Sequence, residues 1–206
     1  MSGSGEEQHE ERWTSFAEPF ERFGEHFEQA EAAGVKLANA MSVATVSADG
    51  RPASRQVLLK GYDRSGFVFY TNLESRKGRH IEANCEVALL FYWRELDVQI
   101  QIEGTAEVVS DEEADAYFAT RPRGSQLGAW ASKQSRPLPS RARLLAAVAK
   151  VEARYLGRDV PRPPHWSGFR VVPRRFEFWR QGAFRLHHRT LYERSGEGWR
   201  VVKLYP

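Results

Sequence analysis

The feature of this chain that most constrains its fold is the regular alternation of apolar and polar residues over residues 97–109, DVQIQIEGTAEVV. Successive side chains of a β-strand point to opposite faces, so the alternation predicts a strand with one buried and one polar face. Further strand-like runs cover residues 41–46 and 51–62, and the intervening Asp49 and Gly50 are typical of a hairpin turn. Strands joined by such short turns pair antiparallel. The sequence therefore predicts a mostly β fold built on an antiparallel sheet.

Helical signals lie around the strands. Phe16, Phe20, Phe23 and Phe27 recur at spacings of four, three and four, which is typical of a helix with one apolar face. Serines that can cap a helix N-terminus begin three further segments. Helices are predicted over residues 15–33, 75–84, 110–120 and 140–156. Residues 123–139, which contain Gly and Pro, are expected to form a loop.

Three more strands are predicted near the C-terminus, over residues 168–173, 174–194 and 198–206. The second contains residues 179–189, WRQGAFRLHHR, which are rich in cations. If these residues form one strand, alternation places Arg185, His187 and Arg189 on one face and His188 on the other. Cations crowded on one face repel each other. Either an anion lies opposite them or the face is a solvated sheet edge.

The length of 206 residues fits a single domain. Residues 1–12 are polar and charged, so we expect a disordered acidic tail followed by one domain over residues 13–206. Strands at this spacing, with helices at the periphery, predict an antiparallel barrel that is either closed or split.

Charge and cysteine content narrow the classes of partner and compartment. The net charge of +3, from 30 basic and 27 acidic residues, is too small to indicate nucleic-acid binding. No run approaches the roughly 18 apolar residues of a membrane helix, and the acidic N-terminus lacks the apolar segment of a signal peptide. The single cysteine, Cys85, cannot form an intrachain disulfide. We expect a cytoplasmic protein with no nucleic-acid or membrane partner.

Several common ligand motifs are missing from the sequence. Neither GxGxxG after a first strand nor GxxxxGK[ST] occurs, and the histidines and cysteine show no metal-ligand spacing, so no metal is expected. Cations instead mark the ends of elements. Arg55 and Lys60 lie near the ends of an apolar strand, where they could bind an anion or simply be solvated. Arg76 and Lys77 fall in the first turn of a predicted helix, a place that disfavours cations unless an anion binds there.

A second group of polar residues follows the helix that ends near residue 120. Tyr117 and Arg121 are four apart and share a helix face, and Ser125 follows in a glycine-bearing turn. A phenol, a guanidinium and a hydroxyl can clamp a phosphate. Alternatively, Tyr117 packs and Arg121 binds the carbonyls at the helix end. Gln134 and Ser135, farther along, could bind a ligand or their own loop.

Taken together, several segments resemble the FMN-dependent pyridoxamine 5′-phosphate oxidase family. In chain order they are RQVLLK, VFYTNLESRKGR, QIQIEG, YFATRPRGSQLGAWASKQS, HWSGFRV, EFW and RLHHR. The similarity runs from about Asn39 to Pro206, and the ordered set is far more specific than any one segment. The resemblance implies an antiparallel split β-barrel with peripheral helices. It also implies a homodimer with FMN at the subunit interface.

The resemblance also implies roles for individual residues. The catalytic residues would be Arg185 and His187. The flavin would be bound by Arg55, Lys60, Tyr70, Thr71, Arg76, Lys77, Gln99, Gln134, Ser135, Trp179 and Arg189. The phosphorylated substrate would be bound by Lys60, Tyr117, Arg121, Ser125, Arg185 and His187.

The implied reaction oxidises pyridoxamine 5′-phosphate or pyridoxine 5′-phosphate to pyridoxal 5′-phosphate. Hydride would pass from the substrate C4′ to flavin N5, and O2 would be reduced to hydrogen peroxide. Arg185 remains charged and is a poor general base, so we expect it to position the substrate and stabilise charge. We expect His187 to form a hydrogen bond and to be able to exchange a proton.

The sequence departs from the family pattern in four places. His188 stands where the usual motif RLHDR has an acid, and Val98 stands where an arginine often precedes the flavin glutamine. WRQG replaces the commoner WQG, and an acidic N-terminus stands where the family has a basic, aromatic segment. The segment FYWRE is similar to flavin oxidases of phenazine biosynthesis. The alternatives are therefore a flavin oxidase of another aromatic metabolite and a non-catalytic flavin- or pyridoxal-phosphate-binding protein.

Overall fold

The structure is a computed structural model that describes residues 12–206. The predicted tail over residues 1–12 lies outside the described residues except for Arg12. That residue begins strand β1 (Arg12–Ser15), in which Arg12 pairs with Val201 of strand β10 (Gly198–Leu204). The described residues therefore begin one residue before the predicted domain, with a strand that the sequence did not indicate.

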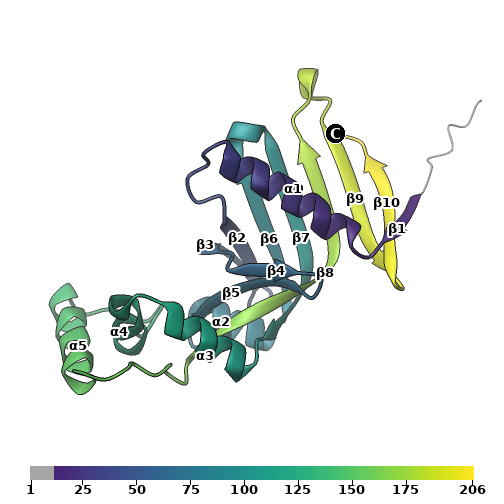
Figure 1. The fold of residues 1–206 in the computed structure, drawn as a ribbon. Coiled ribbons are helices and arrows are strands. Elements are labelled where there is room, and N and C mark those ends of the chain that lie inside the picture. Colours follow the sequence, from purple (N-terminus) through teal and green to yellow (C-terminus); the bar gives the residue numbers. More distant parts are fainter. Residues whose placement is uncertain (1–11) are drawn as a thin grey trace, which may run out of the picture.

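One ten-stranded antiparallel sheet organises the described chain (Figure 1). Neighbouring strands follow the order β1-β10-β9-β8-β7-β6-β2-β3, while β4 pairs with β5 and β5 pairs with β8. The remaining strands are β2 (Ala40–Val46), β3 (Pro52–Leu58), β4 (Gly61–Asp63), β5 (Gly66–Asn72), β6 (Glu86–Trp93), β7 (Val98–Val108), β8 (Trp166–Arg180) and β9 (His188–Ser195). The mostly β, antiparallel fold predicted from the sequence is confirmed.

Strand β8 is long enough to serve two parts of the sheet. Its residues 166–171 pair with β5 and its residues 175–180 pair with β9, while β7 runs along the opposite edge. Because β5 returns to β8, the strands from β8 through β7, β6, β2 and β3 curl round into a barrel. Within residues 12–206 no ladder joins β3 to β5. This open seam makes the barrel a split one, as the resemblance implied.

The described residues form five α-helices outside the sheet. They are α1 (Glu18–Ala32), α2 (Arg76–Ala83), α3 (Asp111–Thr120), α4 (Arg123–Ala131) and α5 (Arg141–Arg154). Ser75, Ser110 and Ser140 each accept a hydrogen bond from the backbone N–H three residues later, which confirms the three predicted N-caps. In Figure 1, α1 crosses one face of the sheet. Helices α3, α4 and α5 lie together at the end of β8 that is far from β9 and β10.

Aromatic packing holds α1 on the sheet. The buried ring of Phe23 meets Phe67 at 4.9 Å and Phe91 at 5.0 Å between ring centroids, both edge to face. Such edge-to-face pairs add to the burial of apolar area. Gly34 follows the helix in the left-handed region, at φ 72°. The predicted apolar stripe is confirmed for Phe20, Phe23 and Phe27, as is the predicted helix end, whereas Phe16 lies before the first residue of α1.

The prediction of a loop over residues 123–139 was wrong for its first part. Helix α4 starts directly after Pro122, and it buries Gln126 and Leu127. The Gln126 side-chain amide donates to the carbonyl of Phe118 at 3.0 Å, which ties α4 to the end of α3. Pro122 is well placed just before a helix, and this packing outweighs the low helix propensity of the glycines in α4.

The prediction of one strand through residues 174–194 was also wrong. Strand β8 ends at Arg180 and β9 begins at His188, with a short helical turn, η2 (Ala183–Arg185), between them. Phe184 and Arg185 adopt left-handed backbone conformations, at φ 55° and 67°. Alternation therefore does not apply across this segment. Arg185, His187 and Arg189 do not share a strand face by that rule, and His188 lies opposite Arg180 at the start of β9.

Among the described helices, none is both long and apolar enough to cross a membrane. Residues 12–206 also contain no group of three or more His, Cys, Asp or Glu side chains that could hold a metal ion. Cys85 is an exposed free thiol.

Candidate active site

A cleft of about 680 Å³ opens where the barrel seam faces helices α3 and α4. Strands β3 and β5 provide one wall, and the end of α3, the start of α4 and Trp166 provide the other. The predicted site residues that line the cleft are Lys60, Tyr70, Thr71, Lys77, Tyr117, Arg121, Ser125 and Gln134. Residues from strands, helices and a loop, up to 74 positions apart in the chain, are thus brought to one place.

One end of the cleft is built around Lys77. Its ammonium group donates to Thr71 Oγ1 at 2.9 Å, Gln134 Oε1 at 3.2 Å and Ser75 Oγ at 3.3 Å. Burial, together with the nearby charge of Arg55, lowers the pKa of Lys77 to about 8. Its hydrogen-bond partners are all neutral. An anion bound at this point would supply the missing negative charge.

Two other predicted cations lie beside Lys77. The Arg55 guanidinium is part-buried on β3, where Nη1 donates to Thr45 Oγ1 at 2.7 Å and to the Val43 carbonyl at 3.0 Å. Burial, and then the charge of Arg76, lower the pKa of Arg55. Ser135 accepts a hydrogen bond from the Arg76 backbone N–H at 3.1 Å. The start of α2 therefore combines cations, hydroxyls and backbone N–H groups, which together suit a phosphate.

The other end of the cleft is built around Arg121. Its guanidinium lies over the Trp166 ring at 4.6 Å and the Phe118 ring at 5.5 Å. Burial lowers its pKa, and its buried Nη1 atom has no hydrogen-bond partner among residues 12–206. A buried donor without a partner is costly, so this atom is ready for an acceptor such as a phosphate oxygen. Ser125 lines the same end of the cleft.

An aromatic stack separates the two ends. The Tyr70 ring stacks on Tyr117 at 3.9 Å and on Trp166 at 5.4 Å, with interplanar angles of 10° and 6°. The Tyr70 hydroxyl donates to Glu113 Oε1 at 3.4 Å, and burial and Glu113 raise the pKa of Tyr70 to about 12. Arg170 holds the same carboxylate with bonds of 2.9 and 3.0 Å. Tyr70 therefore presents its ring, and not a free hydroxyl, to the cleft.

The sequence reasoning missed Trp166 and Glu113. Trp166 is visible in the sequence only as an aromatic residue where a proline-rich connector meets a strand, and this pattern does not indicate a place in the cleft. Glu113 stands out in the sequence only as an acid three residues after the capping Ser110, to whose Oγ its backbone N–H donates at 3.1 Å. The contacts of its carboxylate with Tyr70 and Arg170 depend on the packing of α3 against β5 and β8. No local pattern shows that packing.

The remaining predicted residues form a separate cluster at the far end of β8. Gln99 of β7, Trp179 of β8 and Arg189 of β9 lie opposite one another in three adjacent strands. His187 packs against Trp179 with 4.7 Å between ring centroids. Its Nδ1 accepts a hydrogen bond from the Gly182 backbone N–H at 3.3 Å.

Ionic contacts order part of this second cluster. Arg189 Nε donates to Glu177 Oε1 at 2.7 Å, which raises the pKa of Arg189. Arg185 is exposed at the tip of the loop. Its neighbour Phe184 is 94% exposed, which is unusual for a large aromatic side chain.

A single chain does not bring the two clusters together. Trp166 at one cluster and Trp179 at the other lie on the same strand, thirteen residues apart. At the usual rise of a β-strand this corresponds to roughly 40 Å along β8. Arg185 and His187 therefore cannot reach the cleft of their own chain. The predicted substrate site is divided between two places in the molecule.

Comparison with known proteins identifies the family models and solved structures that this chain resembles. Residues 27–155 match the family model described as pyridoxamine 5′-phosphate oxidase, and residues 166–206 match that of the pyridoxine 5′-phosphate oxidase C-terminal dimerisation region. The solved structure of PhzG from Burkholderia lata 383, in complex with tetrahydrophenazine-1-carboxylic acid, is similar with a TM-score of 0.87. It is 36% identical in sequence, covering 91% of this chain and 92% of that one.

Curated relatives are closer in sequence. The pyridoxine/pyridoxamine 5′-phosphate oxidase of Rubrobacter xylanophilus is 59% identical over 189 residues, which cover 92% of this chain and 87% of the relative. The protein of the same name from Myxococcus xanthus strain DK1622 is 58% identical, covering 92% of both chains. The family models and these relatives together span nearly all of the described residues. This chain belongs to the pyridoxamine 5′-phosphate oxidase family.

Proposed function

We propose that this protein is an FMN-dependent oxidase that forms pyridoxal 5′-phosphate from pyridoxamine 5′-phosphate or pyridoxine 5′-phosphate. The alcohol substrate and O2 give the aldehyde and hydrogen peroxide. The amine substrate, O2 and water give the aldehyde, ammonia and hydrogen peroxide. In both cases the substrate carbon C4′ loses two electrons. The names of the curated relatives support the substrate class.

The observation that carries the proposal is the presence of two anion-binding groups in one cleft. Lys77 at one end is buried and Arg121 at the other is partly buried, and no carboxylate appears among the described residues that line the cleft. Two phosphorylated ligands, a flavin mononucleotide and a vitamin B6 phosphate, would together satisfy both cations. A cleft of about 680 Å³ lies within the usual range for ligand sites.

The residues near Lys77 fit the cofactor. Thr71, Ser75 and Ser135 supply hydroxyls, and Arg55 and Arg76 supply charge, around a lysine whose hydrogen-bond partners carry no charge. Gln99, Gln134, Trp179 and Arg189 are proposed to complete the flavin site. When bound, FMN supplies the two-electron acceptor and is reoxidised by O2. The protein residues bind and orient the two ligands.

At the other end, Arg121 is proposed to bind the phosphate of the substrate. Lys60, Tyr117 and Ser125 are proposed to bind it as well. The unpaired Nη1 of Arg121 provides a donor that is already in place, so little reorganisation is needed when the phosphate arrives. A phosphate held at this fixed point limits how the pyridine ring of the substrate can lie in the cleft. This restriction is a proximity effect, which raises the fraction of bound substrate that can react.

Arg185 and His187 are proposed to act from a second subunit. Three observations support a homodimer: the distance between the clusters, the match to a dimerisation region, and the exposure of Phe184 beside them. Because His187 Nδ1 accepts from Gly182, the neutral ring carries its proton on Nε2, which can donate to the substrate. Arg185, always charged, would position the substrate and stabilise negative charge.

A direct test uses the purified protein and its flavin absorbance. We expect a yellow protein whose flavin is bleached by pyridoxamine 5′-phosphate without O2, then recovers its colour in air with release of hydrogen peroxide. Arg185→Ala should lose turnover and keep FMN, whereas Arg76→Ala should bind FMN more weakly. A flavin-loaded protein that both vitamin B6 phosphates leave oxidised would refute the proposal.

A second candidate is supported by the similarity to the phenazine-bound PhzG structure. A carboxylated aromatic substrate could present its carboxylate to Arg121 in place of a phosphate. Bleaching of the flavin by a reduced phenazine carboxylate, but not by pyridoxamine 5′-phosphate, would favour an oxidase of carboxylated aromatic compounds. Ligand binding without bleaching by either compound would favour a non-catalytic binding protein. The cytoplasmic location and the lack of a nucleic-acid partner stay predictions from composition.

A further inference from the structure

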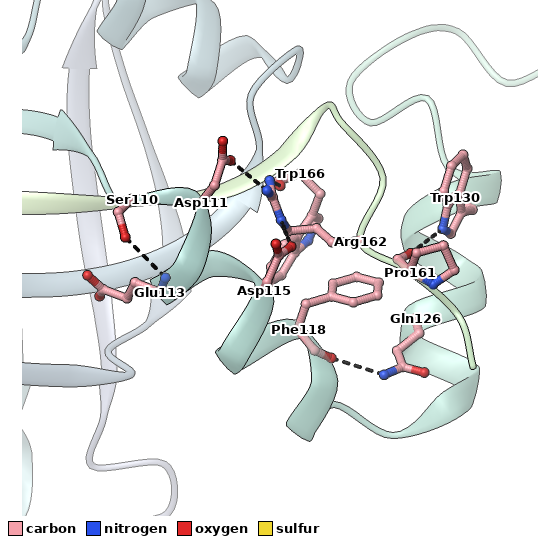
Figure 2. A network of polar contacts seen from close by, with 10 residues as sticks. All are labelled: Ser110, Asp111, Glu113, Asp115, Phe118, Gln126, Trp130, Pro161, Arg162 and Trp166. Atoms are coloured by element: carbon pink, nitrogen blue, oxygen red, sulfur yellow. Dashed lines mark hydrogen bonds and ion pairs between the residues drawn. The ribbon is translucent and has the colours of Figure 1, made fainter.

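The connector between α5 and β8, residues 155–165, has little regular structure but leads directly to a wall of the cleft. It contains Pro161, Pro163 and Pro164, and it ends at Trp166, whose ring lies under Arg121. Prolines cannot donate backbone hydrogen bonds, so the connector depends on other contacts for its position. Those contacts come mainly from α3 and α4 (Figure 2).

Arg162 makes the contacts between this connector and α3. Its Nη2 lies 2.6 Å from Asp111 Oδ1 and its Nε lies 2.5 Å from Asp115 Oδ1, while Nη1 donates to the Trp166 carbonyl at 2.8 Å. The Arg162 side chain is only 12% exposed, although the two aspartates are 82% and 62% exposed. Figure 2 shows the guanidinium between the two carboxylates, with Trp166 beside it.

The two elements that Arg162 joins carry opposite parts of the same wall. Asp111 and Asp115 are four residues apart on one face of α3. The far end of that helix carries Tyr117 and leads into Arg121, and both line the cleft. The start of β8 carries Trp166, which stacks with Tyr70 and supports the Arg121 guanidinium.

Contacts from α4 hold the same connector from the other side. Trp130 Nε1 donates to the Pro161 carbonyl at 2.7 Å, and His165 Nε2 lies 3.0 Å from the Ala129 carbonyl. These contacts fix the path of the backbone. Arg162 adds the link to α3, because its planar fork can bind two carboxylates and a carbonyl at once.

We propose that Arg162 is a positioning residue, which holds Trp166 and α3 at the spacing that lets Arg121 receive the phosphate of the substrate. This inference rests on the proposed function, since the phosphorylated ligand is the one that this wall would bind. The flavin-phosphate residues around Lys77 lie on other elements, namely β3, β5, α2 and the loop after α4, and among the described residues none of them contacts Arg162. Arg162 therefore acts on substrate binding and not on flavin binding.

The expected effect is a loss of phosphate recognition. The phosphate is bound in the ground state and in the transition state alike, so its weaker binding raises KM by more than the looser placement of the bound substrate lowers kcat. In the FMN-loaded protein, Arg162→Met should weaken binding of pyridoxal 5′-phosphate roughly tenfold. Binding of pyridoxal, which lacks the phosphate, and of FMN should each change by less than about twofold. The preference for the phosphorylated ligand would thus largely disappear.

Matched variants separate this role from general loosening of the fold. Arg174→Met removes an arginine that pairs with Glu86 on β6, away from the cleft, and should leave both binding constants unchanged. Arg162→Lys keeps the charge but not the fork, so it should lie between wild type and Arg162→Met. If Arg162→Met fails to fold, Asp115→Asn removes one charge from the same link and should give a smaller change in the same direction.

The test measures binding of pyridoxal and of pyridoxal 5′-phosphate by calorimetry for each variant. It also measures steady-state KM and kcat, FMN affinity and Tm. A lower Tm with unchanged preference for the phosphorylated ligand would overturn the role of Arg162. An equal loss of pyridoxal, pyridoxal 5′-phosphate and FMN binding would overturn it too. A wild-type protein that prefers the phosphorylated ligand but oxidises no vitamer would reject the oxidase while leaving the Arg162 comparison valid.

Discussion

At the scale of single residues, the cleft holds cations that are partly removed from water before any ligand arrives. Burial lowers the pKa values of Lys77, Arg55 and Arg121, and the structure gives Arg121 Nη1 no hydrogen-bond partner. A buried cation without a counter-charge is costly to the folded state, and an anionic ligand offsets that cost. These residues therefore lower the stability of the ligand-free protein and raise its affinity for phosphates.

Lys77 should make both the stability of the ligand-free protein and its affinity for FMN depend on pH. Its pKa falls from 10.5 to about 8 in the folded protein, so between these pH values the unfolded chain holds a proton that the folded chain has released. Its contribution to the stability of the ligand-free protein should therefore rise with pH across this interval. FMN affinity should do the opposite, because neutral Lys77 no longer attracts the phosphate.

Fluorescence titrations of FMN at pH 7, 8 and 9.5 would measure this effect, with Lys77→Arg as the control. The arginine variant stays charged throughout, so its FMN affinity should change much less with pH. An equal decline in the two proteins would assign the pH dependence to another group.

At the other end of the cleft, Arg121→Met tests whether a cation that lowers the stability of the ligand-free protein also raises its affinity for phosphate. Removing a buried donor without a partner should leave the free energy of unfolding of the ligand-free protein no lower than that of wild type, as measured in urea. The affinity for pyridoxal 5′-phosphate should fall by about 2 kcal/mol, or roughly thirtyfold, because a charged hydrogen bond is lost. A variant that is clearly less stable, with affinity unchanged, would show that Arg121 has only a structural role.

At the scale of elements, prediction from sequence succeeded where local chemistry decides the structure. The serine N-caps of α2, α3 and α5 were evident, because a cap depends on residues within one turn. Helix α4 was missed because Gly124 and Gly128 argue against a helix, and the packing of Leu127 that favours it is tertiary. The residues 181–187 were predicted as strand because left-handed Phe184 and Arg185 have no sequence signal.

Gly182 tests whether the loop of residues 181–187 sets the position of Arg185 and His187. A Cβ atom at Gly182 would lie 1.9 Å from the Leu186 carbonyl oxygen, which cannot move away without displacing the loop that carries Arg185 and His187. Gly182→Ala should lower kcat about a hundredfold, with a much smaller effect on FMN affinity.

Gly61→Ala is the matched control for this change, because a Cβ at Gly61 meets no atom within 4 Å and its φ is not positive. The control should keep full activity and stability. Full activity in Gly182→Ala would mean that the loop does not set the position of the catalytic residues.

At the scale of the whole molecule, the structure divides the predicted site residues between two clusters, whereas the resemblance assigned them to one site. The resemblance grouped Arg121 with Arg185 by role, whereas the fold places them at opposite ends of β8. Sequence order carries no information on which residues of one chain meet residues of another. The proposed homodimer, with each cleft completed by the loop of the partner, resolves this separation.

Complementation between two impaired variants, assayed at a substrate concentration too low to saturate Arg121→Met, tests that assembly. Arg121→Met impairs the cleft and Arg185→Ala impairs the loop, so in a mixed dimer one site carries both changes and the other carries neither. Unfolding and refolding an equal mixture should yield about a quarter of the wild-type activity, since half of the dimers are mixed and each has one intact site. Activity that stays at the level of the separate variants would show that each site is built within one chain.

The short strand β1 has a consequence for handling the protein. Its residues 12–15 pair with β10, so a strand of four residues forms this edge of the sheet in place of the seven-residue β10. An uncovered edge strand offers unpaired backbone groups to other chains and promotes aggregation. A version trimmed to begin at Phe16 should scatter more light on standing than a version that begins at Arg12, at equal concentration and with its flavin still bound. Four residues remote from both ligand clusters would then set how long the protein stays dispersed.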